Sequence, residues 1–323
     1  MKPRGWPVST DGYKLSGVRL AICLVALTLG LSFDSGISRV AQDKPLRGLQ
    51  AILDTQAAEF PGRAGIWVKH LTTGEEGAVR ADDTFNSASV IKIPVLVIAF
   101  QMAERGAISL DERIEIRKED IRGGSGVFRY HDVGLRPTFR DVLMQMVITS
   151  DNTATDLAIA KVGGVARVNS WLKENNYGAL RLVQTTGDLF AKYNALTPAD
   201  DRNAKTNADH AFWLGEITPR ATGRMIEAIE KKTIAAAASC EAMLRMMRAQ
   251  QAGQRRLNHF TTVPVAHKTG DFPPVLANDV GVIYARSGSI AIAFLGNEIH
   301  GNYGEAEDKI GRTAQAIVEY FDK

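Results

Sequence analysis

The sequence predicts an α+β protein, with an antiparallel sheet built from N- and C-terminal segments, flanked by helices, and an all-α lobe inserted between them. Three observations predict it: a β-rich hairpin near residue 70, three further β-rich runs after residue 260, and helical periodicity over about residues 108–255. Strands from both ends of a chain most simply join in one antiparallel sheet. We expect a functional site in the cleft between the sheet and the lobe.

The composition is that of an ordinary globular protein. Of the 323 residues 45% are hydrophobic and 23% are charged, which excludes a disordered or fibrous chain. Lys plus Arg number 39 and Asp plus Glu 36, a formal net charge of +3. A balance this close to neutral excludes a strongly basic nucleic-acid binder.

The N-terminal residues have the pattern of a secretory signal. Basic residues precede an apolar run from Leu20 to Leu31, which is too short to span a bilayer comfortably, and small residues follow at Gly36 and Ser38. We expect residues 1–38 to be a signal peptide cleaved near Ser38, residues 39–323 to form the functional domain, and the protein to be periplasmic or secreted. The alternative is an uncleaved membrane anchor. Cleavage would leave Cys240 as the only cysteine, and a lone cysteine is usually a small core residue.

The first elements of the predicted domain are a helix and a hairpin. Apolar residues recur at helical spacing over residues 46–60. A β-rich run over residues 65–71 ends in the turn signal Thr73-Gly74, and a short strand near residues 78–80 completes the hairpin. Residues 89–105 are then apolar on all faces, which predicts a buried helix.

The sequence then predicts helices in the middle of the chain and strands near its C-terminal end. Helical patterns occupy residues 139–148, 154–162 and 225–248, and strands are predicted over residues 263–269, 279–285 and 289–295. A final amphipathic helix runs over about residues 305–321.

The first motif with chemical meaning is Ser89-Val90-Ile91-Lys92, at the start of the buried helix. Residues three apart on a helix share a face, so Ser89 and Lys92 lie together. A serine hydroxyl needs an adjacent base, and a buried lysine can act as one when its amine is neutral. By itself the motif is equally explained by a capping serine and a surface lysine, although an unpaired charge in so apolar a helix is costly.

Two further motifs occur later in the chain. Ser150-Asp151-Asn152 lies between two predicted helices, where each of its residue types is also a common helix cap. Lys268-Thr269-Gly270 ends a predicted strand, where a glycine turn is the simpler explanation. The combination of the three motifs in this order is far more specific than any one of them.

The ordered set resembles the S-x-x-K, S-D-N and K-T-G motifs of class A β-lactamases and penicillin-binding proteins. The resemblance covers most of the chain after residue 38 and is strongest toward the class A branch. The segments that carry it are Phe85-Asn86-Ser87-Ala88-Ser89-Val90-Ile91-Lys92, Ser150-Asp151-Asn152-Thr153-Ala154, Thr218-Pro219 and Val265-Ala266-His267-Lys268-Thr269-Gly270.

The resemblance implies three catalytic residues. Ser89 is expected to attack the carbonyl of a β-lactam or an acyl-D-alanyl peptide, and Lys92 to take the Ser89 proton. Ser150 is expected to relay a proton to the leaving nitrogen. The backbone N–H groups of Ser89 and Asp271 are expected to form the oxyanion hole.

The resemblance also implies the residues that bind substrate. Asn152 is expected to bond the substrate amide and Lys92, Lys268 to supply positive charge near the substrate carboxylate, and Thr269 to donate to it. The strand that carries Lys268, Thr269, Gly270 and Asp271 is expected to bind substrate along its edge. The loop of residues 124–127 is expected to border the cleft.

One departure from the family pattern concerns deacylation. Class A β-lactamases activate the deacylating water with a Glu on a loop after S-D-N, and this chain has no Glu between Glu174 and Glu216. Asp200, Asp201 and Glu216 are possible substitutes. The alternative is that the chain has no deacylating acid. The residues after K-T-G, Asp271-Phe272-Pro273-Pro274, are also unlike the small residues usual in the family and place an acid near the site.

The function expected is therefore a monomeric, exported serine hydrolase without metal or cofactor that acts on β-lactams or peptidoglycan-type peptides. The six histidines have no metal-ligand spacing, His267 is expected to be structural, and Arg255-Arg256 to lie in a solvated loop. Two alternatives follow from the missing Glu. One is a D,D-peptidase or esterase, and the other is a covalent sensor that binds penicillins and releases them slowly or not at all.

Overall fold

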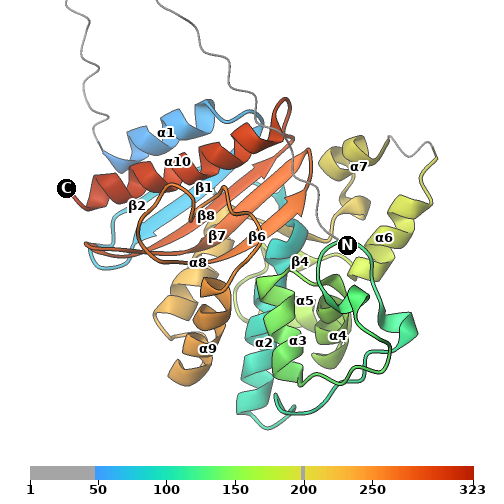
Figure 1. Ribbon diagram of the computed structural model, residues 1–323. Coiled ribbons are helices and arrows are strands. Elements are labelled where there is room, and N and C mark those ends of the chain that lie inside the picture. Colours follow the sequence, from blue (N-terminus) through green and yellow to red (C-terminus); the bar gives the residue numbers. More distant parts are fainter. Residues whose placement is uncertain (1–47, 198–200) are drawn as a thin grey trace, which may run out of the picture. The chain divides into compact units, whose positions relative to one another are not determined.

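The computed structural model describes residues 48–197 and 201–323, so the predicted signal peptide and Asp200 lie outside the described residues. Five strands form one antiparallel sheet in the order β2-β1-β8-β7-β6 (Figure 1). N- and C-terminal strands meet where β1 pairs with β8, from Arg63 opposite Asn297 to His70 opposite Ile290. The predicted α+β class is confirmed. The strands are β1 Arg63–His70, β2 Glu76–Val79, β6 Val265–Phe272, β7 Leu276–Ala285 and β8 Gly288–Asn297.

Helices cover both faces of this sheet. Figure 1 shows α1 (Leu49–Ala58) and α10 (Tyr303–Phe321) side by side on one face and α8 (Pro219–Glu230) on the other. The alternation of β1 explains the two layers, because successive side chains of a strand point to opposite faces. Ile66 and Val68 pack in the cluster under α1 and α10, whereas Trp67 between them belongs to the core on the opposite side.

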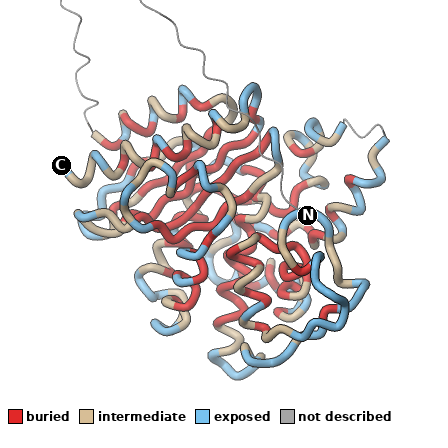
Figure 2. Tube along the Cα trace, viewed as in Figure 1, coloured by how far each residue is buried: buried red, intermediate tan, exposed pale blue. Residues whose placement is uncertain are grey.

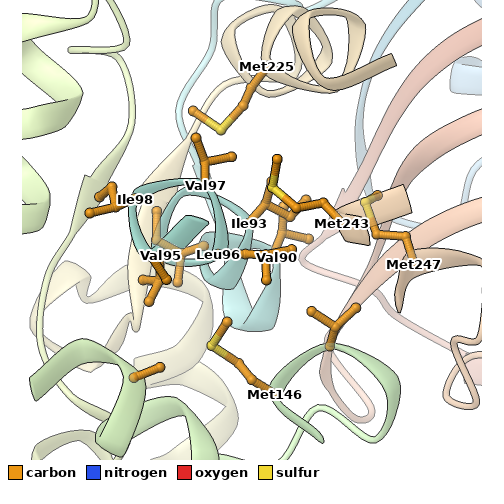
Figure 3. Packing of buried hydrophobic residues seen from close by; sticks show 14 of the residues in the cluster. Val90, Ile93, Val95, Leu96, Val97, Ile98, Met146, Met225, Met243 and Met247 are labelled. Atoms are coloured by element: carbon orange, nitrogen blue, oxygen red, sulfur yellow. The ribbon is translucent and has the colours of Figure 1, made fainter. Parts of the chain in front are cut away.

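The helical lobe is organised around α2 (Lys92–Glu104), which a 3₁₀ turn, η1 (Ala88–Ile91), precedes. Every residue from Lys92 to Phe100 is buried, which confirms a helix apolar on all faces (Figure 2). Figure 3 shows the α2 side chains directed at methionines from three other helices, among them Met146 and Met243. The surrounding helices are α3 Phe139–Ile148, α4 Asn152–Lys161, α5 Gly164–Glu174, α6 Thr186–Asn194, α7 Arg202–Ala208 and α9 Ala237–Arg248.

The interval expected to be all-α also contains two short strands. β4 (Arg181–Leu182) and β5 (Gly215–Ile217) form a three-stranded sheet with β3 (Phe85–Asn86), in the order β3-β5-β4. Strands of two or three residues are too short to show a period-two pattern, which explains why the sequence did not reveal them. They join the lobe to the segment that leads into Ser89.

The single helix predicted over residues 225–248 is two helices, α8 and α9. Lys232 adopts a left-handed conformation with φ of +58°, and the Thr233 N–H bonds the Ala228 carbonyl, so α8 ends there. Cys240 is buried in α9, which confirms it as a core residue. Across the described ranges no helix has both the length and the apolarity needed to cross a bilayer.

Candidate active site

Ser89 lies in the 3₁₀ turn that leads into α2 and lines a cavity of about 340 Å³. Lys92 is the first residue of α2, so Pro94 falls in the first helical turn, where no intrahelical partner is needed for its missing N–H. Pro94 is therefore compatible with the helix. Ala88, directly before the serine, has a positive φ of +39°, a strained conformation that the surrounding structure must hold.

Three buried asparagines hold the segment before Ser89 in place. Asn278 of β7 donates through Nδ2 to the carbonyl oxygens of Asn86 (2.9 Å) and Ser87 (3.1 Å). Asn297 of β8 accepts from the Asn86 N–H at 2.8 Å and donates to Asn278 Oδ1 at 3.1 Å. The nucleophile is thereby tied to the central strands of the sheet. Sequence reasoning missed this cluster, because isolated asparagines in strands show no pattern until the strands are paired.

Lys92 is completely buried and bonds three acceptors of the S-D-N motif. Its Nζ donates to the Ser150 carbonyl (2.7 Å), to Ser150 Oγ (3.1 Å) and to Asn152 Oδ1 (3.2 Å). Burial and the positive charge of Lys268 lower the pKa of Lys92 well below its ordinary value. A lysine in this environment can hold a neutral amine and act as a proton acceptor.

Lys268 approaches the same serine from the other side. Its Nζ donates to Ser150 Oγ at 3.1 Å and to the Thr269 carbonyl at 2.8 Å. Burial lowers the pKa of Lys268 to about 8, against the opposing charges of Asp271 and Asp279. Ser150 Oγ therefore bridges two buried amines, one able to accept a proton and the other still cationic near neutral pH.

The neighbouring loop holds Ser150 and Asn152 in position. Ser150 has a positive φ of +56°, and the Ser125 hydroxyl donates to its carbonyl at 2.9 Å. Asp151 caps α4 through Ala154 N–H and also accepts the N–H groups of Val127 and Phe128. The helix-cap explanation of S-D-N thus holds for Asp151, while its two neighbours face the site. Gly124 and Ser125 line the cavity, which confirms that this loop borders the cleft.

β6 is the edge strand of the sheet, as the proposed binding of substrate along its edge requires. A Cβ at Gly270 would lie 2.6 Å from the Ser87 carbonyl oxygen and 3.2 Å from the Ser89 nitrogen, so only glycine lets β6 approach the nucleophile this closely. Thr269 Oγ1 is buried and has no partner among the described residues, although Thr269 is not among the residues that line the cavity.

The Asp271 side chain lines the cavity but is engaged by Arg256, which is 1% exposed. Arg256 also pairs with Glu307 of α10 at 2.9 Å and donates to the Asn278 carbonyl at 2.8 Å. Burial opposes the charge, but the carboxylates, Asp271 foremost, outweigh it and raise the pKa of Arg256. The expectation of a solvated loop at Arg255-Arg256 was wrong for Arg256, because sequence spacing could not show that two distant carboxylates converge on it.

Of the candidate deacylating acids, the two that the structure describes, Asp201 and Glu216, are not in the cavity. Glu216 of β5 forms a two-pronged ion pair with Arg181, at 2.9 and 2.5 Å, and bonds His210 at 2.8 Å. Asp201 is exposed before α7. Neither lines the cavity. Thr186 of α6 lines that wall instead, and its hydroxyl donates to Asp156 Oδ1 at 2.8 Å.

His267 is structural, as expected. It is buried on the opposite face of β6 from Lys268 and bonds the Asp279 carboxylate through Nδ1 at 2.9 Å. In the part of the chain that the structure describes, no three side chains of metal-binding type converge.

A family model described as the β-lactamase enzyme family matches residues 47–321. Beta-lactamase L2 of Stenotrophomonas maltophilia is 30% identical over 171 residues, which are 52% of this chain and 55% of that protein, so the match spans little more than half of that relative.

Two solved structures show the same fold. The ancestral class A β-lactamase GNCA matches with a TM-score of 0.74 and 24% identity over 85% of this chain and 100% of that chain. A variant of PBP-A, solved as an acyl-enzyme with penicillin G, matches with a TM-score of 0.71 and 22% identity over 86% and 99%. With the family model matching most of its length, the chain belongs to the β-lactamase enzyme family.

Proposed function

We propose that this protein is an exported serine hydrolase that β-lactams, or acyl-D-alanyl-type amides, acylate at Ser89. One observation carries the proposal: Lys92 Nζ, Ser150 Oγ and Lys268 Nζ form a continuous buried chain with both N···O distances at 3.1 Å. The chain starts three residues after a serine that lines the cavity. Such a chain moves a proton from a nucleophile on one side to a leaving group on the other.

These groups are sufficient to account for every proton transfer and every bond change in the proposed acylation step. Neutral Lys92 takes the Ser89 proton as Oγ bonds the substrate carbonyl carbon. The amide C–N bond breaks, and the leaving nitrogen receives a proton from Ser150 Oγ, which Lys92 replaces through their 3.1 Å hydrogen bond. Positive charge on Lys268 favours proton release by Ser150. The N–H groups of Ser89 and Asp271 are proposed to stabilise the oxyanion.

Substrate orientation is assigned to the edge of β6 and to the S-D-N motif. Cationic Lys268 and the unpartnered Thr269 hydroxyl suit a substrate carboxylate. Asn152 lines the cavity and suits the amide of the acyl arm, and its Nδ2 donates to the Gly123 carbonyl at 2.9 Å in this structure.

Hydrolysis of the acyl-enzyme has weaker support than its formation. Among the described residues that line the cavity the only carboxylate is Asp271, and Arg256 engages it. A water molecule near Ser89 therefore has no free carboxylate from the described lining to activate it. This observation favours slow deacylation, as in a D,D-peptidase, an esterase or a covalent penicillin sensor, over rapid β-lactamase turnover.

A time course with a chromogenic cephalosporin, followed by intact mass, tests both points. We expect an initial burst of about one product per protein molecule, a persistent adduct on the peptide that contains Ser89, and slow turnover afterwards. Ser89→Ala should abolish the burst and the adduct. Acylation of Ser89→Ala at the original rate would refute the nucleophile assignment, whereas fast sustained turnover would refute slow deacylation alone.

Export and oligomeric state have separate tests. The mass of the protein recovered from the periplasm or medium of an expressing bacterium should correspond to a chain that begins near residue 39. Retention of the full chain would contradict the proposed cleavage. Sedimentation velocity should give a monomer, and a dimer at micromolar concentration would contradict that part of the proposal.

A further inference from the structure

A further cationic side chain lines the cavity and has no role in the acylation chemistry. Arg202, the first residue of α7, lines the same cavity as Ser89. Its Nε is buried and has no hydrogen-bond partner among the described residues. Among the described acids close to it in sequence, Asp201 is exposed and forms no ion pair with it, Asp209 pairs with Lys205 at 3.1 Å, and Glu216 pairs with Arg181. A buried, unsatisfied guanidinium donor in a cavity is costly unless a ligand completes it.

Aromatic contacts place Arg202 at one end of β6. Its guanidinium carbon lies 5.4 Å from the centroid of the Tyr193 ring, within the range of a cation–π contact. Phe272, the last residue of β6, lies 4.8 Å from the same ring centroid. Thr269 is three residues earlier on that strand, a separation of about 10 Å at the usual rise of a strand. Arg202 therefore lies near the C-terminal end of β6, while Lys268 lies in the middle of that strand.

The wall around Arg202 is apolar, which strengthens its electrostatic effect. Leu189, Phe190, Phe212 and Leu214 line the cavity on this side. Asp271 is the one acid among the described lining residues, and Arg256 engages it. An anion that enters this part of the cavity thus meets a guanidinium in apolar surroundings without competition from a free described carboxylate.

We infer that Arg202 is a specificity-determining residue that binds a carboxylate on the acyl arm of the substrate. The substrate class is then an amide with two anionic groups, one bound at Lys268 and Thr269 and the other at Arg202, joined through an apolar arm that contacts the phenylalanines. The planar guanidinium suits a carboxylate because it donates two parallel hydrogen bonds. This inference rests on the proposed acylation of Ser89.

Two penicillins that differ by one carboxylate test the inference. Carbenicillin has a carboxylate on its phenyl-bearing acyl arm, and benzylpenicillin has the same arm without it. The second-order rate constant for acylation is measured for each by quenched-flow intact mass, and the carbenicillin-to-benzylpenicillin ratio is compared between proteins. We expect Arg202→Gln to lower the ratio about tenfold or more, the usual effect of losing hydrogen bonds to a charged group.

Matched variants distinguish the loss of carboxylate binding from a general loss of acylation activity. Arg202→Lys keeps the charge without the two-pronged geometry and should give an intermediate ratio. Arg245→Gln removes an exposed arginine of α9 that does not line the cavity, and should leave the ratio unchanged. An unchanged ratio in Arg202→Gln, with both penicillins still acylating, would overturn the inference and leave the proposed function intact.

A binding measurement tests, without acylation, whether Arg202 binds the carboxylate of the acyl arm. Phenylmalonic acid monoamide and phenylacetamide reproduce the two acyl arms, and their binding to the Ser89→Ala protein is followed by ligand-observed NMR. We expect the carboxylate-bearing fragment to bind more tightly, and Arg202→Gln to remove the difference. Equal binding of both fragments would overturn the inference. Failure of both penicillins to acylate the unmodified protein would instead contradict the proposed function.

Discussion

Replacing Gly270 with alanine should slow acylation by separating β6 from the nucleophile. The added Cβ would lie 2.6 Å from the Ser87 carbonyl oxygen, whereas ordinary van der Waals contact begins at 3.4 Å, so the two must part by about 0.8 Å. The oxygen cannot easily yield, because Asn278 Nδ2 holds it at 3.1 Å. β6 must therefore move, and it carries Lys268 and the Asp271 N–H with it.

The expected loss is about 10- to 100-fold in the acylation rate constant, because a misplacement of about 1 Å in a catalytic group costs up to 10²-fold. Overpacking also destabilises folded proteins by about 1–3 kcal/mol, so the thermal midpoint should fall as well. Stopped-flow measurement with a chromogenic cephalosporin gives the rate constant, and circular dichroism shows that the variant is folded.

Gly178→Ala is the matched control. Gly178 is exposed, its φ lies outside the left-handed range, and a Cβ there has nothing within 4 Å, so this variant should acylate at the original rate. Acylation of a folded Gly270→Ala protein within about twofold of the original rate would refute the reasoning that close approach of β6 to Ser87 sets the geometry of the site.

The pH profile of the acylation rate constant should be bell-shaped. Lys92 must lose its proton to act as base, so the rate constant should fall at pH values below the lowered pKa of Lys92. Lys268 loses its positive charge above about pH 8, so the rate constant should fall there as well. A rate constant that is flat from pH 5 to 10 would contradict both roles. Arg256→Met should destabilise the fold by about 3–5 kcal/mol, since it leaves Asp271 and a second carboxylate without their cation, and an unchanged thermal midpoint would show that the pair is unimportant. Glu216→Gln should cost about 1 kcal/mol of stability or less and leave the deacylation rate unchanged, and a large loss in single-turnover deacylation would identify Glu216 as the base after all.

Most of the correct predictions of fold and site came from long periodic segments and from motifs that occur in a fixed order. Helix α3 occupies the predicted residues 139–148, and the strands at both ends of the chain join in one sheet as expected. Ser150 Oγ bonds both Lys92 and Lys268, although the three residues come from three separate motifs. These predictions succeeded because each rested on several residues that had to agree.

Residues outside the three motifs whose partners are distant in sequence could not be predicted. Arg256 was taken for a solvated residue because its partners, Asp271 and Glu307, lie 15 and 51 positions away. Asn86 and Asn297 are 211 positions apart and meet only because β3 reaches the end of β8. In both cases the information lies in the packing of elements and not in any local pattern.

The two halves of the proposed reaction are built on different parts of the fold. Ser89, Lys92 and Ser150 come from η1, α2 and the turn before α4, and their neighbours are core residues that fix each side chain. Water activation in class A enzymes depends on an acid from the segment after S-D-N. Here the described lining from that segment consists of Thr186, Leu189, Phe190, Arg202, Phe212 and Leu214, without a carboxylate. The described residues therefore support formation of the acyl-enzyme more strongly than its hydrolysis, because Lys92 and Ser150 are buried beside the cavity, whereas the described lining from the later segment includes no carboxylate.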